Sequence, residues 1–146
     1  MAEPRFDLEQ ETSALREEYY SQAQASNPSP RLQFEYACLL SCSPNREEIR
    51  EALELFNELL EIGFDRPDCL YQISLAHLKL GEYALAKRRV EMLLRIDPRN
   101  LSALSLHSLI MDRTSHDGIV GTIIILAVTA GVVIYLIQTW RKKMQH

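Results

Sequence analysis

The segment Leu70–Pro98, LYQISLAHLKLGEYALAKRRVEMLLRIDP, decides the fold because it predicts two helices joined by a tight turn. Ser74 is a small residue where the two helices would cross, and Ala86 is the small residue of the second helix. Small residues at a crossing let antiparallel helices approach closely, while larger apolar side chains fill the gaps around them. Gly81 begins the turn, and Pro98 ends the unit because proline cannot continue a helix.

The same pattern occurs earlier in the chain, so this segment is one of two repeats. The second helices match at a spacing of 34 residues, where Ile49, Ala52, Phe56 and Leu59 correspond to Tyr83, Ala86, Val90 and Leu93. That spacing is the length of a tetratricopeptide repeat (TPR). The first helices match at a spacing of 36, with two extra residues in the loop Ser43–Arg46. The repetition predicts a stack of antiparallel helix pairs.

Further helices flank the repeats. Asp7–Ala25 has Leu8, Leu15 and Tyr19 on one face, and the proline-rich linker Asn27–Pro30 ends it. Asn100–Arg113 would cap the other end of the stack. We predict an all-α, TPR-like six-helix bundle, with an N-terminal helical arm and linker in residues 1–30 and the TPR-like domain in residues 31–116. The pattern leaves open whether the arm packs on the domain or is mobile.

The C-terminal part contains Ile119–Ile137, a run of 19 apolar residues, and no charge falls between Asp117 and Arg141. A helix over this run would span roughly 28 Å, close to the ~30 Å of a hydrocarbon core. We predict a single transmembrane helix in residues 117–140 and a basic tail in residues 141–146. The expected anchor residues are Ile119, Ile124, Val128, Val133 and Ile137, and the expected targeting residues are Arg141, Lys142 and Lys143.

The position of this run predicts how the chain meets a membrane. Only Arg141–His146 follow it, so we expect insertion after translation, with the N-terminal domain in the cytosol. The alternative, a buried core helix, would need a larger domain to surround it. The part before the run has 20 acidic and 13 basic residues and a net charge of −7, which argues against nucleic-acid binding.

No catalytic, cofactor-binding or metal-binding residues are predicted. The five glycines are scattered and none precedes a lysine, so there is no phosphate loop. The histidines lack metal-ligand spacing with the cysteines, and Cys38, Cys42 and Cys69 form no disulfide pattern. We expect reduced core thiols. A metal or nucleotide bound to the purified domain would instead favour the alternative of a membrane-bound enzyme.

The first helix of each repeat should line the concave side of the stack. The expected partner-binding groove consists of Leu32, Leu39, Tyr71, Leu75 and Leu78, and Leu109 of the capping helix could extend it. This face is too apolar to bind a carboxylate terminus, and it suits an amphipathic helix of a partner. Two alternatives stay open: the chain's own helix Asp7–Ala25 could occupy the groove, or Leu75 and Leu78 could be plain core residues.

Five segments resemble the mitochondrial fission 1 protein family in their order and spacing. They are Gln33–Ala37, Ile49–Leu60, Leu80–Tyr83 with Ala86, Asp97–Asn100 and Asp117–Gly121. Together they cover roughly residues 31–121, and their combination with a tail anchor is more specific than a TPR pattern alone.

The resemblance implies a six-helix bundle on the mitochondrial outer membrane, and often on peroxisomes as well. Family members recruit dynamin-related GTPases for organelle fission, in some lineages through a soluble adaptor. The family's groove carries over to Leu39, Tyr71, Leu75 and Leu78, and its arm to Asp7–Ala25. A homo-oligomer is also compatible with this interpretation. The alternative function is a tail-anchored TPR receptor for protein import, or another scaffold on an organelle surface.

Overall fold

The computed structural model describes the backbone of residues 7–25 and 28–144, and the side chains of these residues except 116–126 and 129. Within this part the chain forms six helices. They are α1 (Leu8–Gln24), α2 (Pro30–Ser41), α3 (Arg46–Glu61), α4 (Arg66–Lys79), α5 (Tyr83–Ile96) and α6 (Leu101–Met144). The prediction of an all-helical, TPR-like fold is confirmed.

The helix pair α4 and α5 has the close crossing that the sequence predicts. Ser74 and Ala86 are fully buried, and the Ser74 hydroxyl donates a hydrogen bond of 2.7 Å to the Ala86 carbonyl oxygen. Gly81 has a φ of +77° in the connecting turn, a left-handed conformation that glycine adopts without strain. The matching pair α2 and α3 is arranged in the same way, with Ala52 and Phe56 fully buried.

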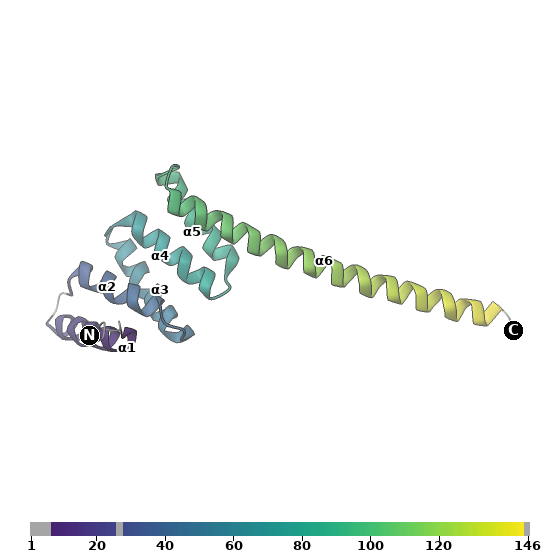
Figure 1. Ribbon diagram of the computed structural model, residues 1–146, viewed down its shortest axis with the longest axis horizontal. Helices are drawn as coiled ribbons and strands as arrows, with labels where there is room; N and C mark the ends of the chain where they lie inside the picture. Colours follow the sequence, from purple (N-terminus) through teal and green to yellow (C-terminus); the bar gives the residue numbers. More distant parts are fainter. Residues whose placement is uncertain (1–6, 26–27, 145–146) are drawn as a thin grey trace, which may run out of the picture. The chain divides into compact units, whose positions relative to one another are not determined.

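Consecutive helices pack side by side from α1 to α5, as Figure 1 shows. The buried side chains form two clusters rather than one. The first lies among α1, α2, α3 and α4 around Tyr36 and Phe56, and the second lies among α4, α5 and the start of α6 around Leu70 and Leu93. Helix α4 contributes to both clusters, so it connects the two repeats.

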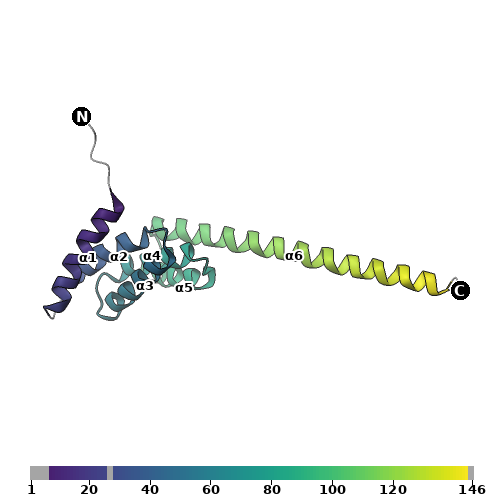
Figure 2. The same cartoon turned by 90° about the horizontal axis from the view of Figure 1, so that it is seen from below.

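Helix α1 packs against α2 over its described residues. The ring of Tyr19 stacks on that of Tyr36, with centroids 5.2 Å apart. The Tyr36 hydroxyl accepts a hydrogen bond from Arg16 Nε at 3.1 Å and donates one to Glu51 at 3.0 Å. Burial is the main cause that raises the pKa of Tyr36 to about 12, so this hydroxyl stays protonated at neutral pH. Figure 2 shows α1 beside α2 from a second direction.

The C-terminal part of α6 belongs to a second structural unit, Met111–His146. The helix does not end near Arg113 as predicted, because no proline interrupts it between Leu101 and Met144. Ile119 and Ile124 of the predicted anchor lie outside the residues whose side chains are described. Val128, Val133 and Ile137 are exposed. A search of the described residues finds no helix with the length and apolar character that crossing a membrane requires.

Replacing Ser74 tests the close helix crossing. We expect Ser74→Leu to lower the free energy of unfolding by about 1–3 kcal/mol or more, because a larger side chain forces α4 and α5 apart. The matched variant Ser74→Ala keeps the crossing and loses one buried hydrogen bond, which costs about 1 kcal/mol. Urea unfolding measures both values. Equal stabilities of the leucine and alanine variants would contradict a sterically limited crossing.

Candidate functional site

An apolar trough lies on the surface between α4 and the first turns of α6. Its cavity has a volume of about 410 Å³. Tyr71 and Leu75 line it from α4, and Leu101, Ser102, Ser105, Leu106 and Leu109 line it from α6. Tyr71 and Leu75 are half-buried, so part of each side chain faces solvent. Both walls of the trough are helical.

A second cavity of about 330 Å³ adjoins the first and shares Tyr71 and Ser102 with it. Its other lining residues are Phe34, Pro67, Asp68, Gln72 and Asn100. Asp68, Tyr71 and Leu75 are spaced three and four residues apart, so they lie along one face of α4. The trough therefore has a polar end at Asp68 and an apolar end at Leu75 and Leu109.

The structure brings together only part of the predicted groove. Tyr71 and Leu75 line the trough, and Leu39 is half-buried on α2 but does not line it. Leu32 and Leu78 are each 8% exposed and belong to the first and second buried clusters, so they are core residues rather than groove residues. The reason is helical geometry: Leu32 is one turn before buried Tyr36, and the direction of Leu78 differs from that of Leu75 by about 60°.

The α6 wall is the part that the groove prediction largely missed. Leu109 was expected to extend the groove, but Leu101, Leu106 and the two serines were not named. The apolar spacing of Asn100–Arg113 indicates an apolar face on this helix, but apart from Leu109 the sequence analysis assigns that face to capping the stack. The Asn100 side chain accepts a hydrogen bond of 3.0 Å from the Ala103 N–H and so starts α6 beside the trough.

The arm does not occupy this trough. The residues that line both cavities belong to α2, α4, α6 and the turn before α6, and none belongs to α1. The apolar face of α1 is used instead against α2, where Leu15 and Tyr19 join the first buried cluster. The hypothesis that Asp7–Ala25 covers the groove is therefore wrong for this structure. The trough is open to a partner.

Two carboxyl groups mark the polar end of the trough. Asp65 precedes α4 with a φ of +34°, and its side chain does not cap the helix. Partial burial is the main cause that raises the pKa of Asp68, and the neighbouring carboxyl group of Asp65 raises it further, although Asp68 keeps part of its surface exposed to solvent. No ion pair between described residues involves either group. The carboxyl group of Asp68 therefore adds negative charge at this end of the trough.

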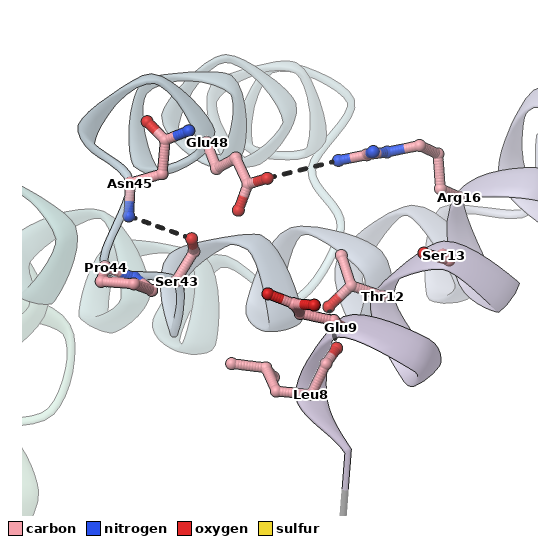
Figure 3. Close-up of a pocket in the computed structure, with 9 residues that line it drawn as sticks. All are labelled: Leu8, Glu9, Thr12, Ser13, Arg16, Ser43, Pro44, Asn45 and Glu48. Carbon is pink, nitrogen blue, oxygen red and sulfur yellow. Dashed lines mark hydrogen bonds and ion pairs between the residues drawn. The ribbon is translucent and has the colours of Figure 1, made fainter.

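A more enclosed cavity of about 380 Å³ lies between the start of α1 and the loop before α3. Figure 3 shows Arg16 directed toward Glu48, with the two side chains 3.7 Å apart. On the loop, the Asn45 N–H donates to the Ser43 hydroxyl at 3.1 Å. The one cationic side chain among the lining residues is thus already paired, and Glu9 and Glu48 disfavour an anion. We assign this cavity to the contact between arm and bundle.

The remaining reactive side chains have structural surroundings. Burial is the main cause that raises the pKa of Cys38 to about 12 and that of Cys69 to about 11, so both thiols stay protonated at neutral pH. His77 lies 3.2 Å from Glu82, which also contacts Arg50 at 2.8 Å, and burial lowers the pKa of this histidine. Among the described residues no three histidine, cysteine or acidic side chains are grouped closely enough to hold a metal.

These features define a class of protein: an all-helical domain of the tetratricopeptide type with an apolar trough on its surface. The family model described as the Fis1 C-terminal tetratricopeptide repeat matches residues 67–119. The mitochondrial fission 1 protein of Gibberella zeae is 35% identical over 114 residues, which cover 75% of this chain and 74% of that protein. The chain belongs to the mitochondrial fission 1 protein family, as the resemblance of its motifs predicted.

Solved structures of the family have the same fold. The crystal structure of the fission protein Fis1 from Saccharomyces cerevisiae aligns with a TM-score of 0.71 at 26% identity, covering 81% of this chain and 90% of that chain. Yeast Fis1 in complex with an Mdv1 fragment, which contains an N-terminal extension and coiled-coil domains, aligns with a TM-score of 0.68 at 22% identity. That alignment covers 81% of this chain and 99% of the yeast chain, and it shows the fold alone.

Stability should depend on pH through Asp68. Its pKa is raised above the ordinary 3.8, so ionising it is less favourable in the folded than in the unfolded state. Its contribution to stability therefore falls as pH rises from about 3.8 through the folded-state pKa. We expect Asp68→Asn to stabilise the protein at pH 7, with the gain shrinking toward pH 3, in urea unfolding. Glu61→Gln, at the exposed end of α3, is the control. A loss of stability in Asp68→Asn at pH 7 would show that the carboxylate is favourable there.

Proposed function

We propose that this chain is an adaptor of the mitochondrial outer membrane that promotes organelle fission by binding a partner protein in the trough of α4 and α6. The observation that carries the proposal is the apolar, solvent-facing trough between α4 and α6, in a member of the mitochondrial fission 1 protein family. If the chain is also inserted into the peroxisomal membrane, it would promote the fission of peroxisomes in the same way.

The trough fits a helix of a partner. Tyr71 and Leu75 offer apolar surface along about one turn of α4, and Leu109 adds to it from α6, which suits side chains at helical spacing on an amphipathic helix. Because these side chains are already about half-buried, covering each contributes on the order of 1 kcal/mol before the entropic cost of association. Contacts of this size give a modest affinity. Yeast Fis1 has been crystallised with a fragment of Mdv1, which supports a soluble protein as the direct partner of this chain.

We infer that the partner is part of a dynamin-related GTPase machinery, bound directly or through such an adaptor. The chain itself would supply no catalysis, and any GTP hydrolysis would belong to the partner. This division of roles agrees with the surroundings of the polar side chains, which form contacts between helices rather than a reaction centre.

The proposal includes a C-terminal membrane anchor. It is supported by the uncharged run Ile119–Ile137 and by the basic residues Arg141, Lys142 and Lys143 behind it. Confinement to a membrane raises the effective concentration of the trough relative to partners on the same surface. Modest affinity at each trough is then sufficient for recruitment.

A double substitution tests the trough. We expect Leu75→Asp with Leu109→Asp to reduce partner recruitment to mitochondria at least tenfold, because two charges would be buried against an apolar helix. Recruitment is measured by fluorescence of the tagged GTPase in cells lacking their own copy of the gene. The matched control is Ile62→Asp with Leu85→Asp, which changes two exposed apolar residues outside the trough.

Folding must be separated from binding in this test. Leu109 is 43% exposed, so Leu109→Asp alone should leave thermal unfolding near that of the wild type while still weakening recruitment. Full recruitment by the folded double variant would overturn the trough as the binding site.

A truncation tests the anchor. We expect deletion of residues 119–146 to move the protein from the mitochondrial pellet to the supernatant on cell fractionation, and to abolish support of fission. Replacing the deleted residues with an unrelated outer-membrane anchor should restore both, because the proposal needs only attachment to the membrane. Retention of the truncated chain on mitochondria would show that the anchor lies elsewhere.

A further inference from the structure

The two ends of the trough differ in chemistry, and this difference restricts which helix can bind there. At one end Leu75 and Leu109 offer apolar contacts. At the other end Asp68 lines the adjoining cavity with Gln72 and Asn100, while Tyr71 lines both cavities. The inference that follows rests on the proposed function, because it describes the partner of the same trough.

Asp65 and Asp68 are two carboxyl groups at the start of α4, and Asp68 lines the cavity that adjoins the trough. Within the described part of the chain neither makes an ion pair. Some acidic groups of the bundle are paired with cations, as Glu48 is with Arg16 and Glu82 is with Arg50. Asp68 is not, and because it lines the cavity that adjoins the trough, its charge is available to a bound partner.

We propose that the partner helix carries a lysine or arginine at the end that lies over Asp68, and apolar anchors at the end that lies over Leu75 and Leu109. Asp68 and Leu75 are seven residues apart on α4, which is about 10 Å or two turns. A helix that runs along α4 would thus place its cation about seven positions from its apolar anchor. This spacing fixes the register and the direction of the bound helix.

Other partner chemistries fit this end less well. An apolar side chain over Asp68 would remove water from the carboxyl pair without replacing its interactions, which is costly for charged groups. An acidic side chain would be repelled by both carboxylates. A cation is attracted and can remain partly hydrated, because Asp68 is exposed to solvent. Charges at such a rim contribute mainly to specificity and to the rate of association.

A selection experiment tests this inference without knowledge of the natural partner. The full-length protein in lipid nanodiscs is the target, and the probe is a phage-displayed library of helical peptides. Each peptide has fixed leucines at helical spacing and randomised positions seven residues to either side. We expect lysine and arginine to be enriched on one side only. When the Asp68→Asn variant is the target, the enrichment of lysine and arginine should disappear. When the Asp68→Lys variant is the target, glutamate and aspartate should be enriched instead.

Binding measurements with selected peptides give the size of the effect. Replacing the enriched cation by glutamine should weaken binding to the wild type by roughly fivefold, and by much less for Asp68→Asn. The control Glu61→Gln changes an exposed acidic residue outside the trough and should behave as the wild type.

The outcomes separate this inference from the function on which it rests. Selected helices that lose binding to Leu109→Asp but show no cation preference would overturn the inference and leave the trough as a binding site. If no helix is selected, or if selected helices bind Leu109→Asp as well as the wild type, the proposed function itself fails.

Discussion

The contact between the Ser74 hydroxyl and the Ala86 carbonyl lies at the crossing of α4 and α5, and much of the bundle depends on this close approach. Only a small side chain lets the two backbones come together, and the polar hydroxyl is tolerated because it has a partner. The larger residues around it, such as Leu70 and Leu93, then close the second core. Since α4 also belongs to the first core, this crossing fixes how the two repeats stack and where the α4 face of the trough points.

Polar side chains in this molecule mostly hold helices to one another. Arg16, Tyr36 and Glu51 fix the arm to the bundle, and Glu82 contacts both Arg50 of α3 and His77 of α4. Because the apolar face of α1 packs against α2, that face is not available to cover the trough. Asp68 is different, since it lines the cavity that adjoins the trough and makes no ion pair with a described residue.

The proposed binding and anchoring functions use different parts of the chain. The proposed trough depends on the packing of α4 against the first turns of α6, whereas the proposed attachment depends on hydropathy and needs no particular tertiary contact. With this separation, the C-terminal run needs only to be long and uncharged, whereas the N-terminal domain needs specific side-chain packing. It also means that weak recognition can be sufficient on a crowded surface.

The sequence by itself determined the helices, the 34-residue repeat, the buried faces at Ala52, Phe56 and Val90, and the family. These depend on local spacing and on side-chain size, which the linear pattern contains. Only the tertiary structure decided that Leu32 and Leu78 are core residues, that the arm lies on α2, and that α6 forms one wall of the trough. The physical reason is that residues on one helix differ by about 100° in direction from one to the next. Whether a given direction is covered depends on where the neighbouring helices pack, and the spacing within a single helix does not contain that information.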